Sequence, residues 1–586
     1  MPNLQSLATR SRGVFLGAAV GDALGWPQEQ NSNIVGGNRN RYIDATPDFR
    51  DWARYAGGQY QKYIDLVPAG NYSDDTQLIL ATGRALQSED WFEALTRREL
   101  PLFLLYSRGA GGATLRACRT WAAGFAPWVS SRTQKSQKAT EAYFRAGGNG
   151  VAMRIAPHVI AHATSPTEEL VARVVQDGVA THGHPRALVG AAAYAVALHV
   201  LVNSEGTLEF GELPALVGAD KSWQFPEMLL KNVSLEWTDT AAEQTRDLIG
   251  SWTSTVNEML GMLSLVEDVA QAGTRGDDLG TLDRLGAFDK KVNGAGTITA
   301  AAAIYLASRN APRPMSGVLR AAFVKNADTD TLASMTGALL GALHGPDWLA
   351  DLRARLQDRE YIERMADDMT SRALSETRPV TANTAFVDER SLRRFRDQLR
   401  VGKGEGKVDL PDKRPGRLIR DFVLESSGRN SAHRWVVEVD GQTLFIDQSA
   451  KLSNAEVEER ATQPKAQAMP LDAEDKAVAK TTEQGRFVGL TLRAKDLNSI
   501  TSFYSEGLGV DVERVGPHEL LVGGAVRFLE DPKATFGMSI VLLAFEVPDV
   551  SAAARRLGYT SREPGEAFRS TDPAGHDLDI RSIRKR

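Results

Sequence analysis

The sequence predicts a multidomain protein: an all-α domain over residues 1–375, a small α+β region over 385–455, a linker over 456–485 and a C-terminal α+β domain over 486–586. Its 586 residues are too many for a single hydrophobic core. Apolar residues recur at helical spacing in the first part, and a strand–helix–strands pattern (βαβββ) occurs twice in the last. The linker is predicted from its Ala, Glu, Lys, Gln and Pro content.

The composition is that of an ordinary globular protein, with 42% hydrophobic and 24% charged residues. The 69 basic and 74 acidic residues give a net charge of −5, which argues against a dedicated nucleic-acid or membrane surface and leaves only a local basic patch open. Cys118 is the only cysteine, which excludes a disulfide framework and a thiolate metal site. We expect a buried, inert thiol and a reducing, cytoplasmic setting.

Six segments of the first domain have apolar residues at helical spacing and are predicted helices: Leu78–Leu86, Leu170–Val179, Ala187–Leu201, Ile298–Leu306, Val318–Val324 and Leu332–Leu343. Period-2 alternation is scarce in this domain, so strands are not expected there. Residues 203–290 are less regular, and we expect them to form a lobe or a long insertion on the helical bundle.

Two acidic clusters, far apart in the sequence, share nearly the same pattern. One is Ser73-Asp74-Asp75-Thr76 and the other is Asp328-Thr329-Asp330-Thr331, and each runs directly into an apolar, helix-patterned segment. Asp and Thr are also ordinary N-cap residues, so one cluster alone would favour simple helix capping. Two matching clusters at opposite ends of one domain-sized stretch instead predict the halves of an all-oxygen site for Mg²⁺ or Mn²⁺.

Small residues recur every four positions in two predicted helices and form one stripe along each: Gly13, Gly17, Gly21 and Gly25 in the first, and Ala333, Gly337, Gly341 and Gly345 in the second. In lipid such a stripe would indicate a dimerisation face, whereas in a soluble chain it favours close approach of another helix. We expect the two helices to lie deep in one bundle with the acidic site between them. The apolar run Gly13–Leu24 contains Asp22 and is too short to span a bilayer.

Three further features could complete a catalytic site around such metals, and each has an alternative explanation. Glu29 follows the glycine-striped helix and could transfer a proton, or be a surface carboxylate. The turn Gly147–Gly150 could cradle phosphate with its amides, and Arg154 beyond it could be a structural ion-pair partner. His182 precedes a long Ala-rich segment and could be catalytic, or a capping or core histidine.

Residues 385–455 begin with a charged predicted helix, Asp388–Arg400, and contain a predicted hairpin. Its strands, Trp435–Val439 and Thr443–Ile446, are joined by the turn Asp440-Gly441. Between the helix and the hairpin, a basic loop could contact phosphate or simply be solvated; it carries Lys403, Lys407, Lys413, Arg414 and Arg417. The sequence assigns no function to this region.

Five segments of the first domain, in order, resemble the ADP-ribosylglycohydrolase family: Gly17–Gly25 with Glu29, Tyr72–Thr76, Gly148–Arg154, Thr181-His182, and Asp328–Thr331 with its Ala/Gly helix. The resemblance implies an all-α fold with a two-magnesium centre in a cleft. It implies that the metals are bound by Ser73, Asp74, Asp75, Asp328, Asp330 and Thr331. It also implies catalytic roles for Glu29, Asp74 and Asp330, and an ADP-ribose-binding role for Gly147, Gly148, Asn149, Gly150 and His182.

The sequence departs from the family pattern at two places. Lys325-Asn326-Ala327 stands where members often carry two glycines, so the backbone there could be less permissive, and Lys325 could alter the rim of the cleft. Ser73 stands where threonine is commoner, which keeps the hydroxyl group. We therefore expect the metal centre to be intact.

The C-terminal domain resembles the vicinal oxygen chelate superfamily, which includes glyoxalase I and bleomycin-resistance proteins. The resemblance rests on Leu492–Leu497, Phe503-Tyr504 with Leu508-Gly509, Phe545–Val550 and Asp572–Gly575. The first repeat is predicted to have strands at 488–492, 510–515, 520–522 and 525–529, and the second at 540–547, near 568 and at 578–580, with a helix at 550–557. Gly489 and Leu542 occupy positions where metal-using members place histidine or glutamate, so we expect a metal-free binding or assembly module.

The principal functional hypothesis is a magnesium-dependent hydrolase that cleaves the C1″ glycosidic bond of ADP-ribose on a modified acceptor. The partner is then an ADP-ribosylated protein, most often modified on arginine in bacterial relatives, with serine, nucleobase and small-molecule acceptors left open. The first alternative is a non-catalytic reader or immunity protein that binds ADP-ribosylated targets and whose C-terminal domains choose the partner. The second is a glyoxalase-like enzyme centred on residues 486–586, and the missing ligand histidines count against it.

Overall fold

The computed structural model describes residues 4–29, 45–58, 61–129, 134–204, 208–245, 247–271, 277–374, 385–401, 406–426, 430–451, 490–494, 496–507, 511–516, 519–522, 526–530, 543–547, 567–571 and 577–582. The chain forms two compact units, Met1–Pro464 and Lys465–Arg586. The predicted boundary between residues 375 and 385 therefore lies within the first unit. The predicted linker, 456–485, lies outside the described residues.

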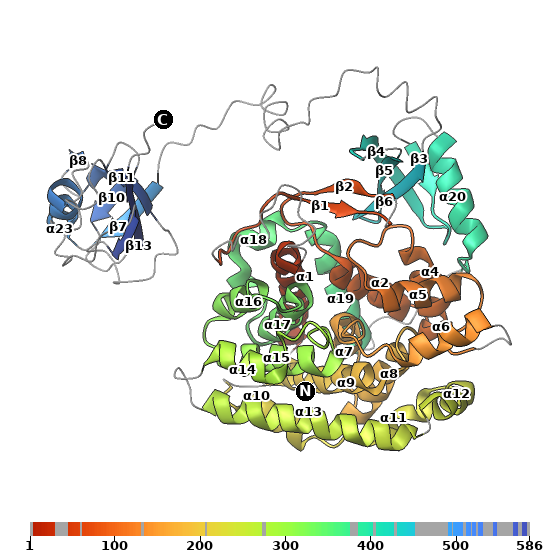
Figure 1. Cartoon of the computed structure of the whole chain (residues 1–586). Helices are drawn as coiled ribbons and strands as arrows, with labels where there is room; N and C mark the ends of the chain where they lie inside the picture. Colours follow the sequence, from red (N-terminus) through yellow and green to blue (C-terminus); the bar gives the residue numbers. More distant parts are fainter. Residues whose placement is uncertain are drawn as a thin grey trace. The chain divides into compact units, whose positions relative to one another are not determined.

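The first unit is mainly helical, as predicted, and contains all six helices expected from apolar spacing (Figure 1). Its first half comprises α1 (Leu4–Glu29), α2 (Asp74–Leu86), α3 (Trp91–Ala94), the π-helix Leu95–Glu99, α4 (Leu100–Phe103), α5 (Gly112–Ala122), α6 (Gln134–Phe144), the 3₁₀ turn Ala152–Arg154, α7 (Ala156–Ala161), α8 (Thr167–Val179) and α9 (Pro185–Asn203). Its second half comprises α10 (Glu212–Ala219), α11 (Pro226–Leu229), the 3₁₀ turn Leu230–Asn232, α12 (Leu235–Thr245), α13 (Leu248–Gln271), α14 (Asp278–Leu285), α15 (Gly296–Arg309), α16 (Pro314–Ala322), α17 (Thr329–His344), the 3₁₀ turn Asp347–Leu349, α18 (Ala350–Arg355), α19 (Arg359–Ala373) and α20 (Glu389–Val401).

Helices α1 and α17 pack with their backbones in contact, as the two glycine stripes predicted. A Cβ atom on Gly13 would lie 2.2 Å from the carbonyl oxygen of Gly341, and one on Gly17 would lie 2.2 Å from that of Gly337. At the end nearest the acidic residues, a Cβ on Gly25 would lie 2.2 Å from the oxygen of Thr329. Any side chain in the stripe would push the helices apart, so the stripe fixes how the end of α1 meets the start of α17.

Residues 203–290, which have a less regular sequence pattern and were predicted to form a lobe or a long insertion, are mainly helical in the part that the structure describes. Most of the segment forms helices α10 to α14. The longest of them, α13, packs against α9, α10 and α15. Its buried face carries Leu248, Trp252, Val256, Met259, Leu263, Val266 and Ala270, which are three or four residues apart. This helical spacing of apolar residues is present in the sequence, but the polar residues between the apolar positions obscured it.

A hairpin of two short strands, β1 (Trp52–Ala56) and β2 (Tyr63–Val67), lies within the domain that was predicted to be all-α. Its inward face is partly charged, because Arg54 lies opposite Asp65 and the two form an ion pair of 2.9 Å. Charged inward positions give no apolar alternation, and for that reason the sequence pattern did not predict these strands.

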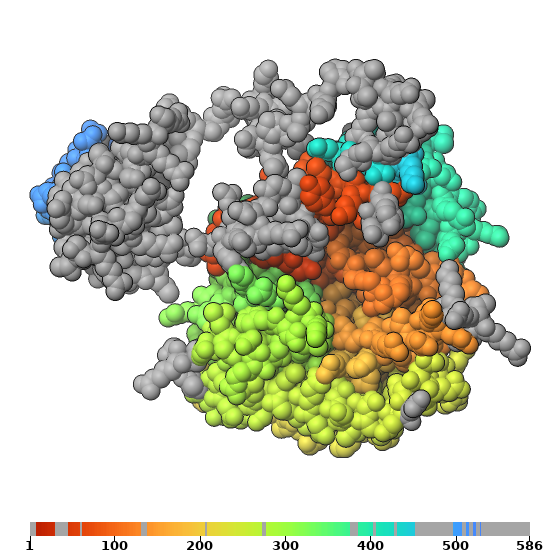
Figure 2. Space-filling view, viewed as in Figure 1, coloured from red at the N-terminus to blue at the C-terminus, as the bar shows by residue number. Residues whose placement is uncertain are grey.

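A four-stranded antiparallel sheet follows the helices in the order β3 (Gly406–Asp409), β4 (Pro415–Leu424), β5 (Asn430–Val439) and β6 (Gln442–Lys451). The predicted hairpin is confirmed: Val439 pairs with Gln442, and the turn residues Asp440 and Gly441 have φ of +55° and +91°, as a type I′ turn requires. The sheet lies against the β1–β2 hairpin, seen as teal beside red in Figure 2, and Tyr63 forms a β-bridge with Ser426.

The segment predicted to be a basic loop contains strands β3 and β4, so this prediction is wrong for its described part, and two of its residues form ion pairs. Arg414 contacts Asp412 at 2.6 Å, and Arg417 contacts Glu438 at 2.5 Å. The charged helix is also present as α20, and Arg396 donates a hydrogen bond from it to the carbonyl of Leu104. These contacts make the segment and α20 part of the fold of the first unit, a structural role that was not among the two alternatives stated for the loop.

The second unit contains two small sheets. The first sheet has the order β7 (Leu490–Ala494), β10 (Val526–Glu530), β9 (Glu519–Val522), β8 (Val512–Gly516), with α23 (Leu497–Thr501) and a π-helix (Ser502–Gly507) between β7 and β8. The second has the order β11 (Leu543–Val547), β13 (Asp577–Ser582), β12 (Ala567–Thr571). In each sheet, the first strand along the sequence pairs in parallel with the last strand along the sequence: β7 with β10, and β11 with β13. The helix predicted at 550–557 lies outside the described residues.

Helix α9 is long and apolar enough to cross a membrane by length and composition, with a mean hydropathy of 1.6 over its most apolar stretch. Within the first unit, 83% of that stretch is buried. The helix packs against α8, α13 and α15. A core helix in contact with neighbours on several sides needs an apolar surface all round, and this explains its composition.

Candidate metal centre

The N-termini of α2 and α17 meet, and they bring the two acidic clusters together. Ser73 is the N-cap of α2, and Asp74 and Asp75 lie in its first turn. Asp328 is the N-cap of α17, and its first turn carries Asp330. The hydroxyl of Thr331 donates a hydrogen bond of 3.2 Å to Oδ2 of Asp75, which links the two helix ends directly.

Glu29, the last residue of α1, lies at the same place. One ligand atom from each of Glu29, Asp328 and Asp330 lies within 4.8 Å of the other two. Asp330 is buried, Asp328 is half-buried and Glu29 is exposed, so this group of three runs from the interior to the surface. We refer to Glu29, Asp74, Asp75, Asp328 and Asp330 as the acidic cluster.

The carboxylates of this cluster destabilise one another's charged forms. Burial, and then the neighbouring charges of Asp22 and Glu29, raise the pKa of Asp74 well above its ordinary value. The pKa of Asp75 is raised by burial, Asp22 and Asp74, and that of Asp330 by burial, Glu29 and Asp328. Such a group is stabilised by bound cations or by protons.

The donor set fits a hard divalent cation. All the side chains offer oxygen, and Oδ1 of Asp75 is buried with no hydrogen-bond partner among the described residues. A buried carboxylate oxygen without a partner carries an energetic penalty that a cation would remove. The cluster can therefore hold a hard divalent cation, for which carboxylate and hydroxyl oxygens are the preferred ligands.

Asp22 is part of this region, although the sequence pattern marked it only as an interruption of an apolar run. It is fully buried in α1 and accepts hydrogen bonds from the backbone N–H groups of Ser73 and Thr76, each at 3.0 Å. It also accepts one of 2.7 Å from the hydroxyl of Thr76. Asp22 thus fastens the N-terminus of α2 to α1, and its carboxylate is already used for that purpose.

The glycine turn, Gly147–Gly150, lies beside Asp328, at the α17 side of the acidic cluster. The side-chain amide of Asn149 donates a hydrogen bond of 2.9 Å to Oδ2 of Asp328. The backbone N–H of Asn149 donates to the carbonyl of Gly294 at 2.9 Å, and Gly148 forms a β-bridge with Ala295. The N–H of Asn149 is therefore engaged within the protein, while its side chain connects the turn to the acidic cluster.

Arg154 has the structural role that was its alternative explanation. It is fully buried, pairs with Asp177 at 2.7 Å and donates to the carbonyl of Gly150 at 2.8 Å. It also donates to the hydroxyl of Thr181 at 2.8 Å, so it holds the glycine turn and the segment before α9 together.

His182 lies against the same turn and is neutral at physiological pH. Its Nδ1 lies 2.8 Å from the hydroxyl of Thr181, and a Cβ on Gly150 would lie 3.0 Å from its Cε1. Burial and the charge of Arg154 lower its pKa to about 3. A neutral imidazole can accept or donate a hydrogen bond to a ligand without adding charge.

Two backbone features complete the surroundings. Gly109 has φ of +100°, and a Cβ there would lie 2.8 Å from Oδ1 of Asp74, so the loop 107–111 passes against the Asp74 side of the cluster. Asn326, in the segment Lys325–Ala327 where the family resemblance implied two glycines, has φ of +66°. Asparagine tolerates this left-handed conformation better than most residues, which answers the concern that the backbone there is less permissive.

The fold and the cluster define a helical protein with an acidic, oxygen-only site suited to hard divalent cations. A profile of the ADP-ribosylglycohydrolase family matches residues 3–379, and the chain belongs to this family. Its members are metal-dependent hydrolases that act on ADP-ribosylated substrates. Among solved structures, a chain of an ADP-ribosylglycohydrolase-related protein complex aligns with a TM-score of 0.38 and 23% identity, over 63% of this chain and 99% of that chain. No curated protein matches the sequence.

Proposed function

We propose that this protein is a magnesium-dependent hydrolase that releases ADP-ribose from a modified acceptor by cleaving the C1″ glycosidic bond, with ADP-ribosylarginine on protein as the first candidate substrate. The observation that carries the proposal is the meeting of two acidic helix N-termini with Glu29 in one oxygen-only cluster. Family membership supplies the substrate class.

The residues proposed to hold two Mg²⁺ ions, or Mn²⁺ in their place, are Ser73, Asp74, Asp75, Asp328, Asp330 and Thr331. Such ions supply Lewis-acid polarisation of substrate oxygens and lower the pKa of water. Glu29 is the exposed carboxylate of the cluster, and we assign it the removal of a proton from the attacking water. Its position at the C-terminal end of α1, opposite the N-terminus of α17, is fixed by the glycine stripe.

We assign the binding of ADP-ribose to Gly147, Gly148, Asn149, Gly150 and His182. The contact between Asn149 and Asp328 supports this assignment, because it places the turn next to the cluster where the scissile bond would lie. The neutral state of His182 supports a hydrogen-bonding role over a role as a fixed cation.

The test is a turnover screen of the purified protein against arginine-, serine- and nucleic-acid-linked ADP-ribose, with and without Mg²⁺. We expect Mg²⁺-dependent release from at least one protein-linked substrate, with arginine the fastest. Calorimetry with free ADP-ribose runs beside the screen. Tight binding of ADP-ribose without release from any substrate would replace the hydrolase with a non-catalytic reader.

For residues 486–586 we infer a glyoxalase-like domain that acts as a metal-free binding or assembly module. The parallel pairing of the first and last strands in both sheets supports it, because this is the order of a βαβββ unit. The full chain is expected to show no turnover of the methylglyoxal–glutathione hemithioacetal with added Zn²⁺ or Ni²⁺. Turnover with either metal would contradict this inference.

A further inference from the structure

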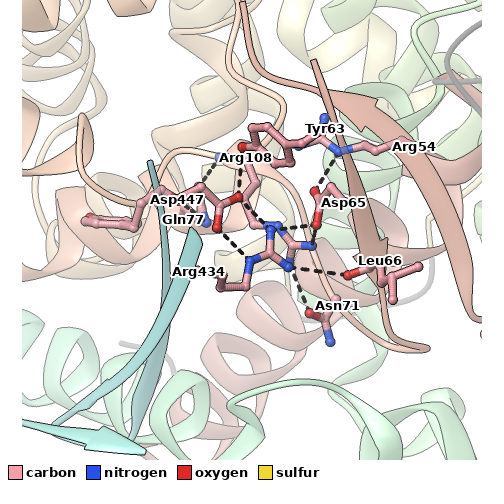
Figure 3. A network of polar contacts seen from close by, with 10 residues as sticks. Arg54, Tyr63, Asp65, Leu66, Asn71, Gln77, Arg108, Arg434 and Asp447 are labelled. Atoms are coloured by element: carbon pink, nitrogen blue, oxygen red, sulfur yellow. Dashed lines mark hydrogen bonds and ion pairs between the residues drawn. The ribbon is translucent and has the colours of Figure 1, made fainter. Parts of the chain in front are cut away.

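The sheet β3–β6 is joined to the helical part by a buried group of charges centred on Asp65 (Figure 3). Arg434 of β5 contacts Asp65 at 2.7 Å and Asp447 of β6 at 2.6 Å. Arg108 contacts Asp65 at 2.9 Å, and so does Arg54. We call these five residues the Asp65 network; Arg434 and Arg108 are almost completely buried in it.

Aromatic rings also hold the guanidinium groups. The guanidinium carbon of Arg108 lies 4.5 Å from the ring centre of Phe445 on β6 and 5.2 Å from that of Trp26 on α1. Arg434 lies 5.2 Å from the centre of the same Phe445 ring. Arg108 is therefore held between the sheet and the helix that ends at Glu29, in contacts that favour a cation next to an aromatic face.

Arg108 lies in the loop 107–111, and the next residue, Gly109, lies against Asp74 of the acidic cluster. Arg108 also donates a hydrogen bond of 3.1 Å to Asn71, two residues before Ser73. Its backbone N–H donates to Gln77 of α2 at 3.1 Å. The position of Arg108 thus fixes the position of the adjacent loop backbone, which contacts Asp74. Arg434 in turn helps to fix the position of Arg108, because both arginines pair with Asp65.

A second set of contacts joins the sheet to the other flank of the same helix end. Tyr72, which precedes Ser73, donates a hydrogen bond of 2.6 Å to Asp358. The same Asp358 oxygen accepts one of 2.9 Å from the backbone N–H of Thr443 in β6. Arg84 of α2 also donates to Gln442 at 2.8 Å. The start of β6 therefore contacts the C-terminal end of α2 directly, and it is linked through Asp358 to the residue that precedes the N-terminal end.

We propose that the sheet β3–β6, although outside the family match, positions the loops that border the acidic cluster, and that Arg434 is the principal positioning residue. This region is then part of the catalytic unit rather than an accessory domain. The inference rests on the proposed function only in treating the cluster as the Mg²⁺ site.

The test compares the full-length variants Arg434→Met and Arg434→Lys with wild type. Binding of Mg²⁺ is measured by calorimetry, and amide hydrogen exchange is followed by mass spectrometry in segments 70–77 and 104–112. Residues that hydrogen-bond metal ligands typically contribute about 10–100-fold to metal affinity, and because Arg434 acts further out, through Arg108, we expect a weakening at the lower end of this range, about 10-fold, in Arg434→Met. Exchange in both segments should become faster. The Mg²⁺ affinity and exchange rates of Arg434→Lys should lie between those of Arg434→Met and wild type, because lysine keeps the charge and loses the bidentate hydrogen bonding.

The matched control is Arg309→Met. Arg309 pairs with Asp278 at 3.2 Å and is buried to a similar degree, but it lies at the far end of α15. That end is roughly 20 Å along the helix from its N-terminus beside the glycine turn. The control should lose stability without changing Mg²⁺ affinity or exchange in the two segments. The same result for Arg434→Met would overturn the inference, because Arg434 would then contribute only stability.

A gentler variant, Tyr72→Phe, covers the case in which Arg434→Met does not fold. It removes one hydroxyl, and we expect faster exchange in segment 70–77 and a smaller loss of Mg²⁺ affinity. Unchanged exchange and unchanged Mg²⁺ affinity would count against the inference. If wild type itself binds no Mg²⁺, the proposed function fails, while the exchange data still decide whether the sheet orders these loops.

Discussion

The acidic cluster and the Asp65 network both contain buried carboxylates, and the loop 107–111 contacts both groups. They differ in how their carboxylates are neutralised. Burial alone would raise the pKa of Asp65, but the guanidinium groups of Arg108, Arg434 and Arg54 lower it below its ordinary value. In the acidic cluster, neighbouring carboxylates raise the pKa further. A buried carboxylate that faces cations of the chain is structural, whereas one that faces other carboxylates marks where an external cation is expected.

The largest effect should come from removing a carboxylate of the acidic cluster. Asp330→Ala is expected to lower Mg²⁺-dependent release of ADP-ribose by about 10²–10³-fold, the scale for losing an electrostatic stabiliser of the transition state. The measurement is the initial rate at saturating Mg²⁺. The control is Glu168→Ala, which removes an exposed carboxylate from the first turn of α8, outside the cluster, and should leave the rate unchanged. Full activity of Asp330→Ala would refute the assigned centre.

The same kind of change in the Asp65 network should instead reduce stability. Asp65→Asn leaves three guanidinium groups without their shared partner, and breaking a buried ion pair costs about 3–5 kcal/mol. Urea unfolding at neutral pH measures the loss. Asp367→Asn is the control, because its pair with Arg12 is about 40% exposed on each side (44% and 41%) and should contribute under about 1 kcal/mol. An equal, small loss in both variants would remove the distinction between the two groups of charge.

The sequence predicted the acidic cluster but not the Asp65 network, and the reason is physical. Acidic residues at helix starts and glycines at a spacing of four are local patterns, and their close packing follows from helix geometry. The hairpin β1–β2 was missed because Arg54 and Asp65 face inward. Arg434 lies 369 residues from Asp65, so only the folded chain shows that they meet. Asp22 was visible as a charge in an apolar helix, which is a signal for a buried hydrogen-bonding role.

A smaller, pH-dependent effect on stability is expected at Glu99, a buried carboxylate that pairs with Arg84 and Arg98. Burial alone would raise its pKa, but Arg84 and Arg98 lower it from 4.5 to about 2. The folded state therefore releases this proton more readily than the unfolded chain does. The ionised form adds stability above pH 4.5, and this contribution is lost as the pH falls toward 2.

The corresponding variant is Glu99→Gln. A pKa shift of this size amounts to about 3 kcal/mol, so Glu99→Gln should be less stable than wild type at neutral pH by a figure of that order. The difference should shrink as the pH is lowered, which urea unfolding across the acid range would measure. A difference that stays constant with pH would mean that the packing of Glu99, and not its charge, is what matters.

The smallest predicted effect is a gain of stability, whereas the effects above are losses, and it tests most directly the comparison between the acidic cluster and the Asp65 network. Asp75→Asn keeps an oxygen that can accept the hydrogen bond from Thr331 and removes one negative charge from the cluster. Because burial, Asp22 and Asp74 raise the pKa of Asp75, the metal-free variant should be more stable than wild type. Added Mg²⁺ should reverse the ranking, since it stabilises only a protein that binds it. A metal-free Asp75→Asn that is less stable than wild type would show that Asp75 is already satisfied by the fold, and the acidic cluster would then be of the same kind as the Asp65 network.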